Sequence, residues 1–232
     1  MRNIKKDKKK QSYMKNGKKY LSVSLVGMLI PILYISLIII LGALNPGYNH
    51  MTMMLSILGG VGGIRGDIFN IGVGTTGGLI ILFAIGLNRA VNQSKARLKG
   101  VFLFILGGLG VIGAAIMNCN QGCTIVLSLD PIRALHGIFA FIAVISLTFA
   151  PFPFYFHFKQ DPQWKKLAAF TLTTVILSSI SSILFYIMFF TNTLPNILGL
   201  IQRLDILFVL IWIGVSSMVL LLALNENSIR LN

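Results

Sequence analysis

Six long apolar runs constrain the fold of this chain more than any other feature. A hydrocarbon core of about 30 Å needs roughly 20 helical residues. The runs do not alternate, and strands with an open edge would leave unpaired backbone groups in lipid. They cover Leu21–Leu44, Ile68–Leu87, Val101–Met117, Ala134–Phe156, Leu167–Phe190 and Ile206–Leu224. The sequence therefore predicts an all-α, polytopic membrane protein with a bundle of six transmembrane helices.

The distribution of positive charge predicts how the chain crosses the bilayer. Of its 20 Lys and Arg residues, nine lie in residues 1–19, four in 88–100 and three in 157–166. The other three connections carry one each, Arg65, Arg133 and Arg203. Because positive loops stay inside, both termini are predicted to be cytoplasmic. We expect three segments: a basic cytoplasmic tail (1–19), a six-helix transmembrane domain (20–225) and a short cytoplasmic tail (226–232).

The Lys-rich tail also bears on partners. It has no apolar set to pack, so it cannot form a folded basic face. Directly before a membrane span, it is attracted to anionic lipid headgroups by about 1 kcal/mol per charge. We therefore expect membrane lipids as partners and no nucleic acid.

A shorter apolar segment follows the first span. Met51–Gly63 has 13 residues, too few to cross the bilayer. It is predicted to be a short re-entrant or interfacial segment. The sequence leaves open whether it lies flat on the membrane or forms a lid or pocket wall.

Polar residues gather at the ends of the spans that are predicted to face outward. Polar groups inside membrane proteins indicate functional sites by default. The candidate outer polar site contains Arg65, Asp67, Asn70, His136, Gln202, Arg203 and Asp205. If the last span begins at Ile206, the last three side chains lie at the interface.

Partners can be assigned to the charged members of this site. Arg203 and Asp205 are two residues apart on a helix, so they point about 200° from each other. We expect Asp67 to pair with Arg203, and Arg65, Arg133 or His136 to pair with Asp205. The hydroxyls near the midplane, Thr148, Ser178 and Ser182 among them, are expected to bond back to their own helices.

The remaining reactive residues point to no cofactor. Cys119 and Cys123 are a candidate disulfide, with free thiols or a metal pair as the alternatives. No third or fourth metal ligand is nearby, and haem would need a second histidine facing His136. The chain has no HExxH, GxSxG or paired-carboxylate motif, so no catalytic residue is predicted.

Several short motifs resemble one family almost end to end, from Tyr20 to Leu224. They are Ser56-Ile57-Leu58-Gly59, Phe69-Asn70, the Cys119-x-x-Gly-Cys123 loop followed by His136, and Gly199-x-x-Gln202-Arg203. The chain resembles the six-span prokaryotic membrane proteins of domain of unknown function nine hundred ninety-eight. The resemblance implies a six-helix fold in the prokaryotic cytoplasmic membrane, a possible outer site and no defined activity. The layout is more distantly similar to Frag/DRAM/Sfk-type membrane proteins.

Three functions are compatible with these features. The favoured one is a lipid-interacting or accessory protein with an outward-facing polar pocket between the second, fourth and sixth helices, which is not an enzyme. The alternatives are a membrane-embedded lipid-modifying enzyme that uses His136 with Asp67 or Asp205, and a small transporter. A transporter would need polar groups near the midplane, where this sequence places only Ser and Thr.

Overall fold

The structure is a computed structural model of an all-helical membrane protein. It describes the backbone of residues 2–118, 130–162 and 164–229, and the side chains of 21–118, 130–162 and 164–222. The described backbone contains no strand, and six of its helical segments are long and apolar enough to cross a membrane. The predicted fold class and number of spans are therefore confirmed.

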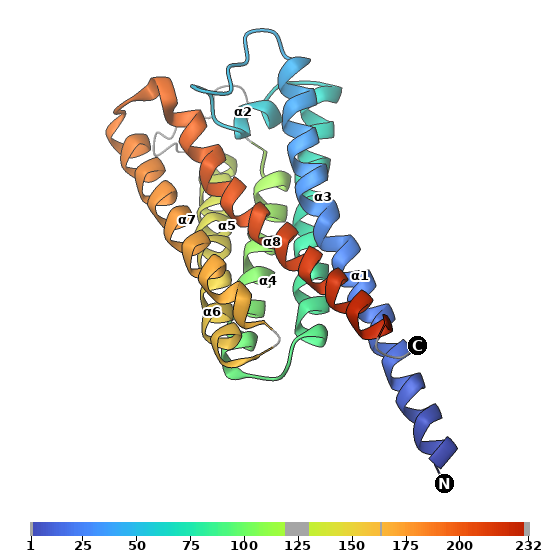
Figure 1. Cartoon of the computed structure of the whole chain (residues 1–232). Coiled ribbons are helices and arrows are strands. Elements are labelled where there is room, and N and C mark those ends of the chain that lie inside the picture. Colours follow the sequence, from blue (N-terminus) through green and yellow to red (C-terminus); the bar gives the residue numbers. More distant parts are fainter. Residues whose placement is uncertain (1, 119–129, 163, 230–232) are drawn as a thin grey trace.

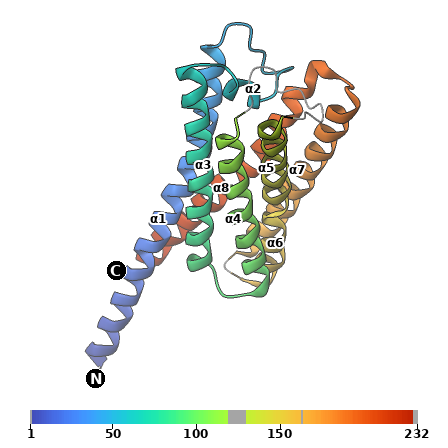
Figure 2. The same ribbon diagram turned by 180° about the vertical axis from the view of Figure 1, so that it is seen from behind.

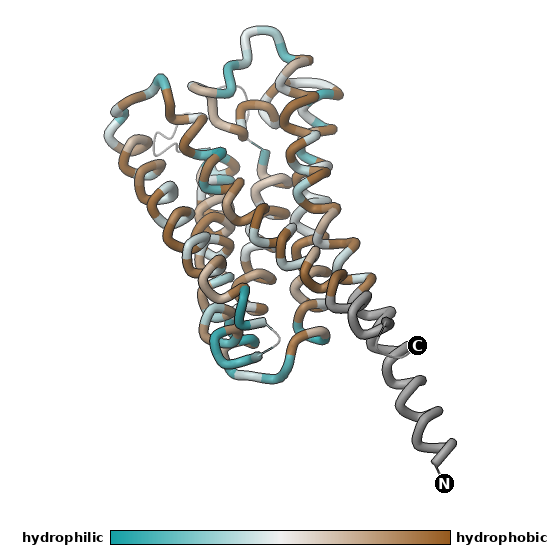
Figure 3. The backbone as a smooth tube through the Cα atoms, viewed as in Figure 1, coloured by the Kyte–Doolittle hydropathy of each residue, from teal (hydrophilic) through white to brown (hydrophobic). Residues whose placement is uncertain are grey.

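Successive membrane-spanning segments run antiparallel to one another (Figures 1 and 2). Their bounds are α1 Arg2–Ala43, α2 Ser56–Gly59, α3 Ile64–Ala90, α4 Lys95–Ile116, α5 Pro131–Phe149, α6 Pro151–Gln160, α7 Lys165–Thr191, the 3-10 turn η1 Pro195–Ile197, and α8 Leu198–Ile229. Apolar residues cover the middle of the helices, and hydrophilic residues gather at the connections (Figure 3).

Both chain ends lie at the same end of the bundle (Figure 1). We call this the terminus end, and the opposite end, which carries residues 44–63, the loop end. An even number of spans requires this arrangement. Which end faces the cytoplasm stays a prediction, as do the limits of the three predicted segments. The candidate disulfide Cys119–Cys123 lies outside the described residues.

Two spans differ from their predicted form. The fourth consists of α5 and α6, and Pro151 begins the second of them because proline lacks a backbone donor but fits the first turn of a helix. The sixth begins earlier than predicted, since α8 starts at Leu198 directly after η1. The predicted start at Ile206 was therefore wrong by two helical turns, and this changes the position of Asp205.

Close packing of α3 on α4 depends on Gly77 and Gly108. A Cβ on Gly77 would lie 2.7 Å from the Gly108 carbonyl oxygen, and a Cβ on Gly108 would lie 2.8 Å from the Gly77 carbonyl oxygen. Gly74 and Gly78 have the small-xxx-small spacing that is typical of such contacts. Gly78, however, has nothing within 4 Å of its Cβ position.

The terminus half of the bundle is filled by aromatic side chains. Trp212 of α8 stacks on Phe104 of α4 with ring centroids 5.3 Å apart, and Phe154 and Phe158 of α6 complete the cluster. All four are fully buried. The indole Nε1 of Trp212 donates to the hydroxyl of Thr171 at 3.0 Å. This half of the bundle therefore has an aromatic core in the described residues.

Candidate functional site

A cavity of about 640 Å³ occupies the loop half of the bundle. Its walls come from α1, α3, α4, α5, α7 and α8 and from the segment before α2. Most lining residues are apolar, including Ile80, Val111, Phe185 and Val209. Of the candidate site residues, Asn70, His136, Gln202 and Asp205 line the cavity, whereas Arg65, Asp67 and Arg203 do not.

The polar centre of the cavity is the carboxyl group of Asp205. Its Oδ1 accepts hydrogen bonds from Ser178 Oγ at 2.7 Å, from Ser182 Oγ at 2.7 Å and from Thr148 Oγ1 at 3.3 Å. The Thr148 and Ser182 hydroxyls are also 3.1 Å apart. We call these four residues the carboxyl–hydroxyl cluster. All four are buried, and Asp205 is 3% exposed.

This cluster lies deep in the membrane-spanning part of the bundle. Ser178 is the middle residue of α7, 13 residues from each end of Lys165–Thr191. Asp205 follows Leu198, the first residue of α8, by seven residues, or about 10 Å of helix. The expectation that Asp205 lies at the interface was therefore wrong. A charged Asp at such depth costs about 2.5–3.5 kcal/mol on insertion scales, and the three hydroxyls offset part of this cost.

The hydroxyls of Thr148, Ser178 and Ser182 were expected to bond to carbonyls of their own helices, and this expectation was wrong. Thr76 and Thr174 do bond back to carbonyls of their own helices, at 2.9 Å each. Ser178, Ser182 and Thr148 instead turn toward Asp205. The carboxylate is a stronger acceptor than a backbone carbonyl that already holds a helical bond. Among the described side chains, no ion pair joins Asp205 to Arg65, Arg133 or His136, so the expected partners were wrong.

Arg203 fastens the 44–63 segment onto α8. Its guanidinium donates to the Met53 carbonyl at 2.9 Å, to the Gly199 carbonyl at 2.7 Å and to the hydroxyl of Tyr48. It also lies over the Tyr48 ring, 5.6 Å from the centroid. Asp67 is exposed at the start of α3 and is not its partner in the described structure. The expected pair of Arg203 with Asp67 was therefore wrong.

Two further side chains hold the same segment over the cavity. The Leu55 amide donates to Gln202 Oε1 at 2.8 Å, and Asn70 Nδ2 donates to the Gly59 carbonyl at 3.1 Å. Leu55, Leu58 and Gly59 are buried. Since Met54, Leu55 and Ser56 line the cavity, the segment forms one of its walls. Only Ser56–Gly59 is helical, so the predicted interfacial segment is mostly turns.

A glycine allows the segment to approach α8 closely. A Cβ on Gly199 would lie 2.4 Å from the Met53 carbonyl oxygen and 2.9 Å from the His50 carbonyl oxygen. The Leu200 amide donates to the Met51 carbonyl at 3.0 Å in the same contact. The Gly199-x-x-Gln202-Arg203 motif therefore acts as one unit that binds the backbone of the segment.

The titratable groups of this contact are shifted by their surroundings. Burial raises the pKa of Tyr48, and the Arg203 cation opposes this shift. Burial and then the positive charge of Arg203 lower the pKa of His50 below its usual 6.5. The two rings meet edge to face with centroids 5.1 Å apart. The contact between His50, Tyr48 and Arg203 therefore favours the neutral form of His50.

The other predicted site residues lie apart from this contact. Arg65 is exposed and donates to the Leu44 carbonyl. His136 Nδ1 lies 2.9 Å from both the Ala114 and the Met117 carbonyl oxygens, which binds α5 to the end of α4. Within the described residues, no hydrogen bond joins His136 to Asp67 or Asp205. The predicted outer site is therefore divided between a loop contact, a helix contact and the buried cluster.

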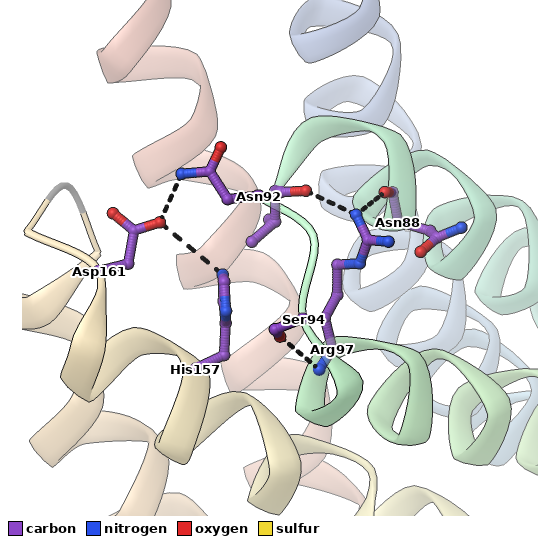
Figure 4. A network of polar contacts seen from close by, with 7 residues as sticks. Asn88, Asn92, Ser94, Arg97, His157 and Asp161 are labelled. Carbon is purple, nitrogen blue, oxygen red and sulfur yellow. Dashed lines mark hydrogen bonds and ion pairs between the residues drawn. The ribbon is translucent and has the colours of Figure 1, made fainter.

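A second polar network holds the terminus end together (Figure 4). Arg97 is buried in the first turn of α4 and donates to the carbonyls of Asn88 and Val91 at 2.8 and 2.9 Å. Asn92 donates to Asp161 Oδ2 at 2.8 Å, and His157 Nε2 lies 3.8 Å from the same oxygen. These contacts join the α3–α4 connection to the end of α6, a structural role that sequence reasoning missed.

Sequence reasoning also missed the hydroxyl partners of Asp205. A signal for two of them was present, because Thr174, Ser178 and Ser182 recur every four residues along a helix whose charged residues lie only in its first turn. Such a stripe puts the hydroxyls on one face. Its meaning depends on α8 and α5, which lie on that face only in the folded bundle.

Fold and cavity together define a class: a multi-pass helical membrane protein with a carboxyl–hydroxyl cluster inside its bundle. The family model described as Protein of unknown function (DUF998) matches residues 28–219, so the chain belongs to this family. No curated protein and no solved structure matches the chain significantly. The layout similarity to Frag/DRAM/Sfk-type proteins stays a prediction.

Proposed function

We propose that this protein binds a membrane lipid in the cavity between α3, α5 and α8. The observation that carries the proposal is the cavity itself, about 640 Å³ with mostly apolar walls, in a bundle of membrane-spanning helices. Pockets for small ligands measure about 300–1,000 Å³ and are mostly apolar with a few placed polar groups. A lipid chain is the apolar molecule present at the highest concentration around such a protein.

The packing of α5 supports entry from the side. This helix packs mainly on α4 and only lightly on α7. The cavity lining includes Ile138, Phe141 and Phe190, which are 54%, 51% and 72% exposed on the bundle surface. The rings of Phe141 and Tyr186 are 5.4 Å apart across the α5–α7 boundary. A lipid would therefore enter between α5 and α7 by displacing side chains rather than helices.

Polar residues also line the cavity near the loop end, where they can bind further polar groups of the lipid. Arg133, His136, Asn70 and Gln202 line this part of the cavity. Arg133 is paired with Asp130 at 3.4 Å, so it presents a cation whose position is held. The 44–63 segment would separate this region from water, in keeping with an outward-facing pocket in the predicted topology.

Two glycine variants test the proposal as a matched pair. Neither Gly137 nor Gly78 has any atom within 4 Å of its Cβ position, so both accept a side chain without a clash. Only Gly137 lines the cavity. In native mass spectrometry of the detergent-purified protein, Gly137→Leu should reduce the lipid-bound fraction several-fold and Gly78→Leu should leave it unchanged.

The same experiment can refute the proposal. If wild type carries no lipid in mild detergent, or if both leucine variants carry as much as wild type, the cavity does not hold lipid. Thermal unfolding of both variants provides the folding control.

A further inference from the structure

We infer that the carboxyl–hydroxyl cluster binds the protonated amine of an amphiphile whose chain occupies the cavity. This rests on the proposed function, because the same cavity would hold the chain, and it adds the chemistry of the polar group. Asp205 is the one carboxylate among the described residues that line the cavity, and its side chain is buried.

The hydrogen-bond geometry suits an anionic Asp205. Three hydroxyls converge on its Oδ1, two of them at 2.7 Å. A carboxylate anion accepts from all three hydroxyls without offering a proton of its own. The hydroxyls are donors without charge, so they stabilise the anion but do not neutralise it.

The described side chains do not supply the missing positive charge. Their ion pairs are Arg133 with Asp130 and His157 with Asp161, at opposite ends of the bundle. Arg203 points to the backbone of the 44–63 segment and does not line the cavity. A buried anion in a membrane favours a cationic partner, and the accessible space beside Asp205 is the cavity.

The walls of the cavity favour an ammonium group attached to an apolar chain. The lining includes the aromatic side chains of Tyr34, Phe69, Phe141, Phe185 and Tyr186. Aromatic faces attract cations, most strongly where water is excluded. The combination of one carboxylate with aromatic and aliphatic walls matches an alkylammonium ion. It disfavours a fatty acid, whose carboxylate would be repelled by Asp205.

The oxygen that remains for the ligand is Oδ2. The three hydroxyls occupy Oδ1 and hold the carboxyl group in one orientation. An ammonium group donates three hydrogen bonds and can meet Oδ2 from the cavity side. The alkyl chain would then extend toward the gap between α5 and α7.

Three probes with the same twelve-carbon chain test this inference: dodecylamine, dodecanol and dodecanoate. Their binding to the purified full-length protein is measured by native mass spectrometry at neutral pH. Wild type should bind dodecylamine roughly tenfold more tightly than dodecanol, equivalent to about 1.4 kcal/mol, and dodecanoate most weakly. Asp205→Asn, which keeps the shape and removes the charge, should abolish the preference for the amine.

Asp67→Asn is the matched control, because Asp67 is exposed and lies outside the cavity. This variant should keep the preference of wild type. Retained preference in Asp205→Asn, equal binding of the three probes to wild type, or preference for dodecanoate would each overturn the inference. Thermal unfolding identifies a misfolded Asp205→Asn, and Ser182→Ala then serves as the second variant, with an expected partial loss of the preference.

The outcomes separate this inference from the proposed function. If Gly137→Leu excludes lipid while wild type shows no preference for the amine, the lipid site stands and the role of Asp205 is refuted. If Gly137→Leu leaves bound lipid unchanged while Asp205→Asn abolishes the preference, the amine site stands and the lipid proposal fails.

Discussion

Replacing Arg203 by alanine should release the 44–63 segment from the loop end of the bundle. Arg203 makes two hydrogen bonds to this segment, one to the Met53 carbonyl at 2.9 Å and one to the Tyr48 hydroxyl. Its third bond, to Gly199, stays within α8. The substitution therefore removes two tertiary hydrogen bonds and the contact of the cation with the Tyr48 ring.

The size of the effect follows from these contacts. Hydrogen bonds to charged groups contribute about 1.5–3 kcal/mol each, and an exposed cation–ring contact about 0.5–1 kcal/mol. The segment is partly exposed, so water replaces the lost partners and the lower ends of these ranges apply. The local opening free energy should fall by about 3.5 kcal/mol. This corresponds to a roughly 300-fold increase in the opening equilibrium constant.

Hydrogen exchange measures this opening directly. The informative amides are those of Met53, Leu55 and Leu200, which donate to Asn49, Gln202 and Met51. Their exchange should accelerate by about two orders of magnitude, while amides in the middle of the spanning helices keep their protection. The global unfolding midpoint should change little, because the segment opens as a local unit.

Arg65→Ala is the control for charge and position. Arg65 is exposed and donates one hydrogen bond within the described residues, to the Leu44 carbonyl at the start of the same segment. Its loss should cost under about 1 kcal/mol. The reasoning fails if Arg203→Ala changes exchange by less than about fivefold, or if Arg65→Ala has an equal effect.

Three further predictions concern other contacts. Gly77→Ala should destabilise the bundle by about 1–3 kcal/mol in chemical unfolding, because its Cβ meets the Gly108 carbonyl oxygen at 2.7 Å; Gly78→Ala should be neutral or stabilising. The pKa of His50 is lowered in the fold, so its contribution is present above the unfolded value of 6.5 and is lost as the pH falls. The protection factors of amides in the 44–63 segment should therefore fall toward about pH 5, after correction for the intrinsic exchange rate, and His50→Gln should remove this dependence. Arg97→Ala should lower stability by about 2–4 kcal/mol because it leaves two carbonyls at the terminus end unpaired, whereas exposed Lys99→Ala should change unfolding by less than about 0.5 kcal/mol.

The number and type of the spanning elements could be predicted from the sequence alone. Hydrocarbon thickness sets the length of a span, and the need to pair every backbone group in lipid selects the helix. Neither condition depends on which helices are neighbours. The six runs were therefore correctly recognised, although the fourth span is divided into α5 and α6 and the sixth helix begins earlier than its run.

The role of the polar residues could not be predicted in the same way. Gln202, Arg203 and Asp205 are near neighbours in the chain, yet the first two bind the 44–63 segment and the third binds hydroxyls inside the bundle. This division arises because successive helical residues point in different directions, about 100° apart. The length of an apolar run indicates only that its helix can span the membrane. The polarity of a side chain indicates only that it needs a hydrogen-bond partner.

The sequence by itself determined that this chain is a six-helix membrane protein and which residues needed a polar partner. Only the tertiary structure decided that Asp205 lies inside the membrane-spanning bundle beside Ser178, Ser182 and Thr148. The physical reason is that insertion into lipid depends on each segment separately. A hydrogen-bond partner or a cavity wall, by contrast, depends on several helices at once, here α5, α7 and α8.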